Sequence, residues 1–551
     1  MTKLHFGIMV NGFVLKKWQI VIIENLISNG HKLDIIIQNS EKEIFKKSKY
    51  AKYLGKNSLY NLYLKFFHNP DMLSNVDFSQ TLNQYDVIEV VAELKGKFSQ
   101  YFATDKIEII KAKNLDFILR FGFNIIKGEI LNSAKYGVWS FHHGDEREFR
   151  GGPPGFWEIY YHKNINGIIL QKLTEKLDGG MIIRKGMFSI VNHSYSTHLN
   201  ELLRHGINLI LFAVENLSHN GELKMTIAEI ETSKIYKFPG NFEMFRFLTI
   251  LIFNRIKFNL QDLFLHENWN IGIAQQKVDD FVQNEKLEEI HFIPESENSF
   301  FAADVFISET DEVVSLFYED FDYKSFKGKI SSRDFQKVNN SFTESETILE
   351  KPYHLAFPFL WVQNGKQYLV PEANHSNSLR RFKIDSQSKT ILDENIIMKS
   401  DCIDSVVFKY NDLYWIFCTK KAYGTNDYLF AYYADDFFGD WSSYKNNPIV
   451  SDSRKARMAG NIFMANGKLY RPGQKNNVFY GEAIVFNEII ELTKDAYVEK
   501  EIFKLMPSQF LKFSKGIHTF SVSKNYIAID AKNYKFVRSE FLRKIKLKIR
   551  K

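Results

Sequence analysis

Apolar positions at the start of the chain switch between short extended runs and a helical period. Residues 4–10 form one apolar run, and residues 32–38 form another. Between them, residues 16–30 carry apolar side chains at helical spacing and end on a glycine. A strand, a helix and a second strand in this order are typical of a parallel α/β domain.

The same alternation continues along the first part of the chain. Further strands are expected at 85–91 and 115–122, and residues 197–217 read as a long amphipathic helix that would pack against the sheet. We therefore predict an α/β domain with a mostly parallel sheet over residues 1–220. Residues 221–294 form a mixed connector of strand and helix.

Beyond residue 295 the pattern becomes a repeat of β-hairpins. Five segments share a strand, a turn and a second strand rich in Tyr, Phe or Leu, at a spacing of roughly 50 residues. The pairs Asn364-Gly365 and Asn466-Gly467 are typical of tight hairpin turns. One four-stranded blade for each repeat predicts an all-β five-bladed propeller over residues 295–534. The second strands fall near Phe317, Leu369, Trp415, Tyr470 and Ile527.

The net charge of +7 is concentrated in a basic tail, residues 535–551, which holds eight Lys or Arg residues and one acid, Glu540. The rest of the chain is close to neutral, so we expect no nucleic-acid partner. Two interpretations of the tail stay open. It is either a solvated terminus or, with its interleaved apolar residues, a peripheral contact with an anionic membrane.

Cys402 and Cys418 are the only cysteines, which excludes a disulfide framework and a zinc-ligand set. No metal is expected. A reducing compartment fits this composition, and residues 4–15 lack the charge order of a signal peptide, so we expect a cytoplasmic location with possible membrane-peripheral contact. The apolar segment 242–265 is interrupted by charged residues and is at most a core or interfacial helix.

The densest candidate chemistry lies between residues 116 and 186. Arg150-Gly151 follows His142 by eight residues, and Asp178 follows it by 36. A histidine can relay a proton, and a carboxylate can orient the histidine. The pattern therefore suits acid–base chemistry.

These offsets resemble those of the formyltransferase superfamily, whose members take a formyl group from 10-formyltetrahydrofolate. The resemblance implies that 10-formyltetrahydrofolate is the donor. It also implies catalytic roles for His142, Asp178 and Ser140. Ser140 stands where the family has Asn, and its shorter hydroxyl leaves open a weaker or differently arranged site. Taken singly, His142 and Asp178 also read as turn residues, and the adjacent His143 could face the cleft as well. Further matching positions are Pro154, Asn166-Gly167-Ile168 and Leu177-Asp178-Gly179-Gly180.

The resemblance also implies a folate-binding segment. In the family, the residues after the strand that ends here at Phe121 wrap the pterin ring, and in this chain Gly122, Phe123 and Asn124 occupy that place. Small and flat side chains suit a stacked heterocycle, although Gly122 can equally be a simple strand end. Arg120 is unusual for a buried strand and would contact an acid or the glutamate of the folate.

The second half carries a set of short motifs: Ala303-Asp304, Phe357-Pro358, Pro371-Glu372, Asn447-Pro448, Arg471-Pro472, Gln474 and His518. These motifs resemble those of glycosidase-like five-bladed propellers and of the N-terminal propeller of glucosamine inositolphosphorylceramide transferases. In such folds, polar residues converge on the central axis, where a sugar is bound or cleaved. The carboxylates of Asp304, Glu372 and Asp404 fall one per blade, so they read either as a pair for glycoside hydrolysis or as hairpin-end residues. The predicted substrate-binding residues are Asp304, Glu372, Asp404, Arg457, Arg471 and Gln474.

Taken together, these features predict an enzyme that formylates an amine. The expected acceptor is an amino sugar on a glycan or a sugar nucleotide, with the propeller recognising carbohydrate. One alternative is a carbohydrate-binding or glycoside-processing protein whose formyltransferase-like domain is inactive, which Ser140 favours. Another is a carbohydrate-binding peripheral membrane protein. Formylation of transfer RNA is not expected, because the positive charge is confined to the tail.

Overall fold

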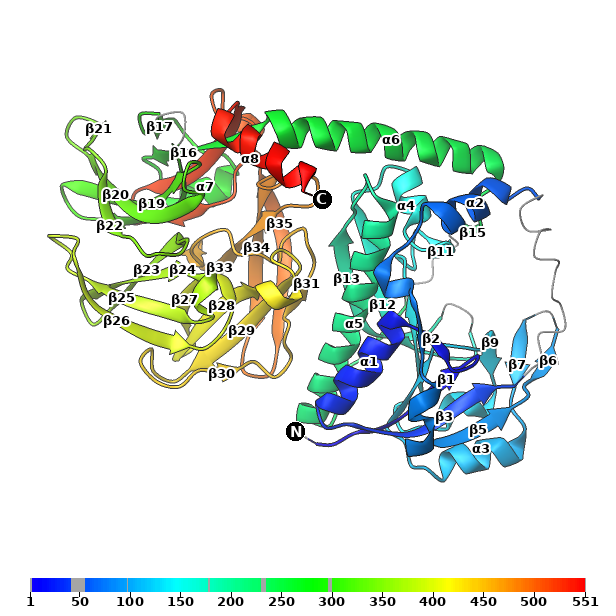
Figure 1. The fold of residues 1–551 in the computed structure, drawn as a ribbon. Coiled ribbons are helices and arrows are strands. Elements are labelled where there is room, and N and C mark those ends of the chain that lie inside the picture. The colour runs from blue at the N-terminus through cyan, green and yellow to red at the C-terminus, as the bar shows by residue number, and fades with distance from the viewer. Residues whose placement is uncertain are drawn as a thin grey trace. The chain divides into compact units, whose positions relative to one another are not determined.

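The computed structural model describes residues 2–40, 55–96, 98–176, 179–228, 234–295 and 300–550. The chain divides into two compact units, Met1–Ile256 (unit 1) and Lys257–Lys551 (unit 2). The division falls within helix α6 (Asn241–Phe264), the long green helix of Figure 1. The predicted connector is therefore shared, because residues 266–292 contribute strands β16 (His266–Ala274) and β17 (Ile290–Phe292) to unit 2.

Among the described residues, the core of unit 1 is an eight-stranded sheet in the order β14-β13-β12-β10-β8-β1-β3-β5. Its parallel part is β5 (Asp86–Val90), β3 (Lys32–Asn39), β1 (His5–Val10), β8 (Phe117–Arg120) and β10 (Val138–His142). Its antiparallel part is β12 (Ile165–Lys172), β13 (Met181–Ser189) and β14 (Thr226–Ile227). The predicted α/β class of the N-terminal domain is confirmed.

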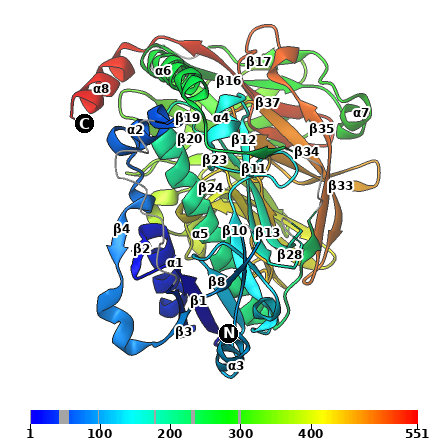
Figure 2. The ribbon, with the colours of Figure 1, turned by 90° about the vertical axis from the view of Figure 1, so that its right-hand side faces the viewer.

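Helices and loops cover the sheet of unit 1 (Figure 1 and Figure 2). The helix predicted at 197–217 corresponds to α5 (Tyr195–Asn220). It packs on β12 and β13 and against α1 (Lys17–Ser28). Elsewhere on the sheet, α3 (Thr104–Lys111) contributes Ile107 and Ile110 to a buried cluster. The central strands are buried on both sides, as a parallel sheet requires. The shorter elements are β2 (Val14–Lys16), α2 (Ser58–Phe66), β4 (Asn75–Asp77), β6 (Glu93–Lys95), β7 (Ser99–Tyr101), β9 (Ile125–Lys127), β11 (Arg150–Gly151), α4 (Phe156–Tyr160) and β15 (Ile235–Tyr236).

The described part of unit 2 contains five antiparallel sheets, which confirms its all-β class. The first holds β18 (Phe300–Glu309), β19 (Val313–Asp322), β20 (Lys327–Gln336), β21 (Ser341–Phe342) and β22 (Glu346–Leu349). The second holds β23 (Ala356–Gln363), β24 (Lys366–Glu372), β25 (Leu379–Ile384) and β26 (Ile391–Met398). The third holds β27 (Cys402–Tyr410), β28 (Leu413–Lys420), β29 (Tyr428–Ala434), β30 (Ser442–Ser443) and β31 (Val450–Ser451). The fourth holds β32 (Phe463–Ala465), β33 (Lys468–Lys475), β34 (Ala483–Leu492) and β35 (Tyr497–Leu505).

The predicted hairpins lie where the pattern placed them. Each of the five predicted second strands is the second strand of a hairpin, and each lies in a different sheet. Asn364 and Gly365 have φ of 51° and 68°, and Asn466 and Gly467 have φ of 48° and 75°. Two consecutive positive φ angles are what a tight hairpin turn of the predicted type requires.

The fifth sheet joins strands from the two ends of unit 2. It runs β17-β16-β37-β36, with β36 at Phe520–Val522 and β37 at Ile527–Lys535. β16 and β37 pair antiparallel over their whole lengths, from His266 opposite Lys535 to Ala274 opposite Ile527. The early strand can therefore complete its sheet only after the end of the chain has been made.

The basic tail continues from β37 into a helix, α8 (Arg538–Ile549), rather than an irregular terminus. Two of its lysines pair with Asp262 near the end of α6: Lys544 Nζ lies 3.1 Å from one carboxylate oxygen and Lys548 Nζ lies 2.9 Å from the other. The short helix α7 (Val278–Asn284) packs in the same unit. In the described part of the chain, none of the helices has both the length and the apolar character needed to cross a bilayer.

The pairing of β16 with β37 predicts that unit 2 cannot fold without its last strand. A chain that ends at Tyr526 loses β37 and should lose the cooperative thermal transition of unit 2, whereas a chain that ends at Lys535 loses only α8 and should keep it. Differential scanning calorimetry of the two truncations checks this expectation. A retained transition in the shorter chain would show that the fifth sheet is dispensable.

Candidate functional site

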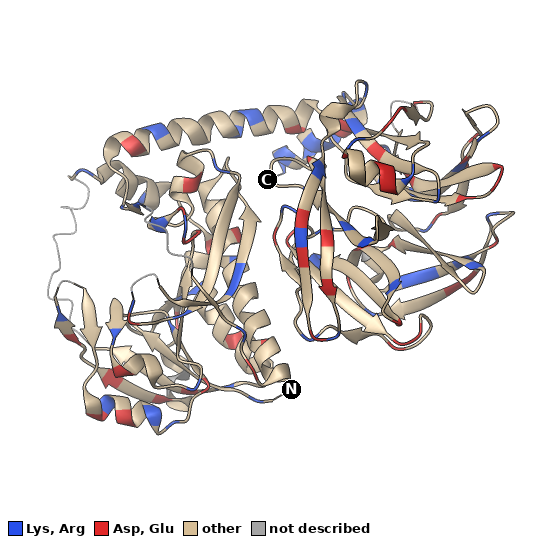
Figure 3. Ribbon diagram, turned by 180° about the vertical axis from the view of Figure 1, so that it is seen from behind, with Lys and Arg blue, Asp and Glu red and all other residues tan. Residues whose placement is uncertain are grey.

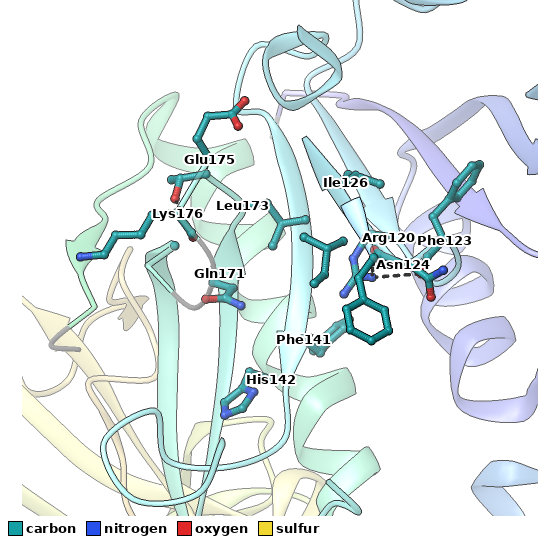
Figure 4. A pocket seen from close by; sticks show the side chains of 14 residues that line it. Arg120, Phe123, Asn124, Ile126, Phe141, His142, Gln171, Leu173, Glu175 and Lys176 are labelled. Atoms are coloured by element: carbon teal, nitrogen blue, oxygen red, sulfur yellow. Dashed lines mark hydrogen bonds between the residues drawn. The ribbon is translucent and has the colours of Figure 1, made fainter. Parts of the chain in front are cut away.

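A pocket of about 350 Å³ opens in unit 1 where β8 and β10 end. These two strands run parallel, so their carboxyl ends meet at one edge of the sheet, where ligands of open α/β sheets bind. Figure 4 shows the side chains that surround the space. The lining residues include Arg120, Phe123, Asn124, Ile126, Phe141, His142, Gln171, Leu173, Glu175 and Lys176.

His142, a predicted catalytic residue, is the last residue of β10 and lines this pocket. Its Nε2 atom lies 3.2 Å from the carbonyl oxygen of Phe149. Because a carbonyl oxygen only accepts hydrogen bonds, Nε2 carries the proton in the neutral ring and Nδ1 is the basic nitrogen. The strand thus presents a half-exposed histidine with one nitrogen fixed by the following loop.

The adjacent His143 does not line this pocket. It is partly buried, with its ring against Trp18 and Phe141. Burial, with a smaller contribution from the charge of His142, lowers the pKa of His143 to about 4, so it is neutral at physiological pH. Of the two candidate histidines, the structure therefore brings His142 to the pocket.

Ser140 lies behind the pocket wall and is bound to Arg120. Its Oγ accepts hydrogen bonds from Arg120 Nη2 at 2.9 Å and from Nε at 3.3 Å. Ser140 is buried and does not line the pocket, whereas Arg120 does. A serine oxygen that accepts from a guanidinium keeps its own O–H free to donate. Ser140 thus positions Arg120, which forms part of the pocket wall. The sequence signal for Arg120 was the presence of an arginine in a buried strand.

The predicted folate-binding segment is held in place by the same arginine. Arg120 Nη1 donates to the carbonyl oxygens of Phe123 and Asn124, at 3.3 and 3.1 Å. Phe123 adopts a left-handed φ of 63°, and its N–H donates to Asn11 Oδ1 at 2.7 Å. Phe123 and Asn124 line the pocket.

Gly122 has a different role in that segment. It is not among the pocket-lining residues, and a Cβ at this position would lie 2.6 Å from the backbone nitrogen of Asn11. The glycine is therefore needed because the chain passes this close to the end of β1. Asp178 lies outside the described residues, and Gly180, two residues later, lines the pocket.

The loop that follows His142 packs tightly onto β12. A Cβ at Gly167 would lie 2.9 Å from the backbone of Asp145, which explains this glycine of the motif. Lys185 from β13 bridges Asp145 and Glu146, with Nζ to oxygen distances of 3.1 and 2.8 Å. The loop carrying the acceptor for His142 is thus anchored to the antiparallel half of the sheet.

In unit 2, five of the six predicted substrate-binding residues converge. Arg457 Nε lies 2.5 Å from Asp404 Oδ2, and its Nη2 lies 3.9 Å from Glu372 Oε2. Gln474 donates to Asp404 Oδ2 at 2.7 Å. Asp304 belongs to the same charge cluster, because its carboxylate acts electrostatically on Arg457 and Glu372. These five side chains are buried or nearly so.

Arg471 does not join this cluster. Its Nε lies 2.8 Å from Glu499 Oε2, and its Nη1 donates to the carbonyl oxygen of Lys455. Arg471 and Gln474 are three residues apart on β33, and side chains an odd number apart point to opposite faces of a strand. Arg471 therefore stabilises the fourth sheet by linking β33 to β35.

The structure adds His518 and Asp530 to the cluster. Nε2 of His518 lies 2.9 Å from Asp304 and Nδ1 lies 2.9 Å from Asp530, so the ring bridges the first and fifth sheets. Burial alone would lower the pKa of His518, but the charges of Asp530 and Asp304 raise its pKa to about 10. Ligand atoms of these three residues lie within 4.8 Å of one another, yet each ring nitrogen already faces a carboxylate.

Glu372 holds its proton more tightly than an ordinary carboxyl group does. Burial, together with the charge of Asp404, raises the pKa of Glu372 to about 8. Glu372 is therefore protonated at neutral pH beside an Asp404 that is paired with Arg457. A protonated acid next to a carboxylate is the combination that glycoside hydrolysis uses, but here the groups are already engaged with one another.

Comparison with known proteins finds similarity to two classes of transferase. Residues 281–535 match the family model of the N-terminal region of glucosamine inositolphosphorylceramide transferase 1. The rice transferase of that name (japonica subspecies) is 29% identical over 206 residues, 36% of this chain and 28% of its own. The Arabidopsis thaliana protein is 29% identical over 213 residues, 37% of this chain and 27% of its own. Methionyl-tRNA formyltransferase of Bacillus subtilis strain 168 is 37% identical over 83 residues, 15% of this chain and 26% of its own. The chain thus spans about a quarter of the length of these relatives.

The bond between Arg120 and Ser140 predicts that Ser140→Ala destabilises unit 1. A buried guanidinium that loses an acceptor should cost about 1.5–3 kcal/mol of unfolding free energy. Ser133→Ala is the matched control, because the buried Ser133 hydroxyl donates to a neutral carbonyl, that of Ile130. Urea unfolding of both variants should show the larger loss for Ser140→Ala, and equal losses would contradict the pairing.

The bridge at His518 predicts a pH-dependent stability of unit 2. The pKa of His518 is raised from 6.5 to about 10, so its stabilising effect is complete below pH 6.5 and is lost as the pH rises toward 10. His518→Gln should cost about 3–5 kcal/mol at pH 6.5 and much less near pH 10.

Thermal unfolding of the variant and the natural protein across that range measures this difference. The exposed His375→Gln in the same unit is the control and should change neither the stability nor its pH dependence. Parallel pH curves for His518→Gln and the natural protein would rule out the bridge.

Proposed function

We propose that unit 1 transfers a formyl group from 10-formyltetrahydrofolate to a primary amine. The observation that carries this proposal is the meeting of His142, Arg120 and the Phe123–Asn124 segment around one pocket at the carboxyl edge of a parallel sheet. Its volume, about 350 Å³, lies within the range of small-molecule sites. The similarity to a methionyl-tRNA formyltransferase supports the same reaction class.

The geometry suits the steps of such a transfer. The amine nitrogen attacks the formyl carbon, the bond between that carbon and N10 of the folate breaks, and the proton released by the amine is passed to N10. We assign the relay of that proton to Nδ1, the basic nitrogen of the His142 ring. Arg120, held by Ser140, supplies positive charge at the wall where the oxyanion develops. Asp178 would orient His142, as the resemblance implies.

The acceptor we propose is an amino sugar, on a glycan or a nucleotide-linked precursor, that unit 2 helps to recognise. Support comes from the match of residues 281–535 to a family whose name includes glucosamine. We also propose that the five sheets close into a propeller. β18 contacts β23, β23 contacts β27, and β18 contacts β37. Gln474 links the fourth sheet to the third, and Gly460 bridges to Phe520 of the fifth.

A second candidate is a carbohydrate-processing protein whose first unit no longer transfers formyl groups. The protonated Glu372 beside Asp404 favours it in unit 2, and Ser140 in place of the family Asn favours it in unit 1. The two candidates differ in one requirement, because the formyltransferase has to bind folate.

The proposed reaction predicts release of tetrahydrofolate from 10-formyltetrahydrofolate in the presence of an amino sugar or its nucleotide-linked form. His142→Asn should lower the rate roughly a hundredfold or more, because it removes the basic nitrogen. His162→Asn is the matched control: His162 is exposed, lies outside the pocket and has a φ of 55°, which asparagine tolerates. Absorbance of the released folate over a panel of amino sugars measures the rate.

Folate binding without catalysis separates the two candidates. A stable folate analogue should raise the unfolding temperature of unit 1 if the pocket holds the donor. Turnover that His142→Asn leaves unchanged would assign the reaction to another residue. No folate stabilisation and no turnover would favour the carbohydrate-processing candidate.

A further inference from the structure

Helix α6 carries an apolar stripe on its exposed side. The stripe residues fall within about a third of the helix circumference, a sector that also holds Arg246 and Thr249. Each of them is between 46% and 79% exposed. They are Phe242, Phe245, Ile252, Phe253, Ile256, Leu260 and Phe264.

This stripe does not serve the core of unit 1. The opposite side of α6 already does so, because Met244, Phe247 and Leu251 are buried there and Phe247 stacks on Phe156 with ring centroids 4.0 Å apart. A helix with one buried face normally turns polar side chains outward. Exposed apolar patches on this scale mark interaction surfaces.

Acidic groups are kept off the stripe. The two acids of α6 are engaged elsewhere: Glu243 accepts a hydrogen bond from the backbone N–H of Gly240 at 2.5 Å, and Asp262 pairs with Lys544 and Lys548 of α8. Figure 3 shows α6 as largely tan, with a few blue and red bands.

Helix α8 adds positive charge at the end of the stripe. Phe541 of α8 packs on Phe264, with ring centroids 5.5 Å apart, so the basic helix is docked against the last turn of α6. Within the described residues, no carboxylate forms an ion pair with Lys546 or Arg550. The stripe thus ends beside cations that have not been neutralised.

We propose that the α6 stripe and the α8 cations bind the surface of an anionic lipid membrane, with α6 lying in the plane of the interface. Phenylalanine and isoleucine side chains would enter the boundary between headgroups and acyl chains, while α8 would contact anionic headgroups. A parallel symmetric contact between two copies through α6 would bring two α8 helices, and hence like charges, toward each other, which disfavours that pairing.

Flotation of the full-length protein with vesicles tests this proposal. The protein should bind vesicles of phosphatidylcholine and phosphatidylglycerol in equal parts, more weakly vesicles of phosphatidylcholine alone, and less well as salt rises. The triple variant Phe242→Ser, Phe245→Ser, Phe253→Ser should bind the mixed vesicles at least about tenfold more weakly. Lys546→Glu with Arg550→Glu should lose most of the preference for mixed over neutral vesicles.

A matched triple variant provides the control. Val338→Ser, Val362→Ser and Leu511→Ser remove three exposed apolar side chains of unit 2 that lie outside α6 and α8, and should leave binding unchanged. Calorimetry should show natural unfolding temperatures for both triples. If the α6 triple is destabilised, the double variant Ile252→Ser, Ile256→Ser replaces it.

Three outcomes would overturn the proposal. The natural protein would fail to bind the mixed vesicles, or the α6 triple would bind them as well as the control triple does. In the third, light scattering would show a dimer that the α6 triple abolishes, which would assign the stripe to self-association.

Discussion

The pairing of β8 between β1 and β10 is the constraint on which the architecture of unit 1 depends. β8 is only four residues long, and its register with both neighbours places Arg120 and Ser140 at the same sheet edge. A slip of one residue would turn Arg120 to the other face and leave Ser140 without its donor. The loop over the edge depends on the same register, because Arg120 also binds the carbonyl oxygens of Phe123 and Asn124.

The two units use polar side chains in opposite ways. In unit 1, His142 lines the pocket and has one ring nitrogen held by a backbone carbonyl. In unit 2, Asp404 and Arg457, and likewise Asp304 and His518, satisfy each other inside the fold. A buried charge without a partner destabilises the fold, so the first role of these ion pairs is to stabilise the contacts between sheets.

Repetition in unit 2 explains how distant residues reach one cluster. β18, β23 and β27 share the same irregularity of register near their starts, with left-handed residues at Asp304, Phe357 and Asp404. In the first and third sheets this position holds the carboxylate. In the second it holds Phe357, and the acid comes instead from Glu372, which ends β24 opposite Ala356. The repeated backbone irregularity thus places two of the three carboxylates, and the third comes from the neighbouring strand.

The sequence predicted the elements well, because strand alternation, helical period and turn residues are local signals. The parallel strands, α5, the five hairpins and the all-β class follow from patterns within a few residues of each other. The placement of His142, Phe123 and Asn124 at one pocket also agrees with their motif positions.

By itself, then, the sequence determined which segments are strands and helices and which residues are candidates for chemistry. Tertiary structure alone decided which candidates meet. Ser140 accepts hydrogen bonds from Arg120, 20 residues away, and Asp304 pairs with His518, more than 200 residues away. Arg471 points to the opposite face of its strand from Gln474, and α6 has a second apolar face that is exposed. Periodicity reports the face on which a side chain lies, but its partner is set by the packing of elements that are far apart in the chain.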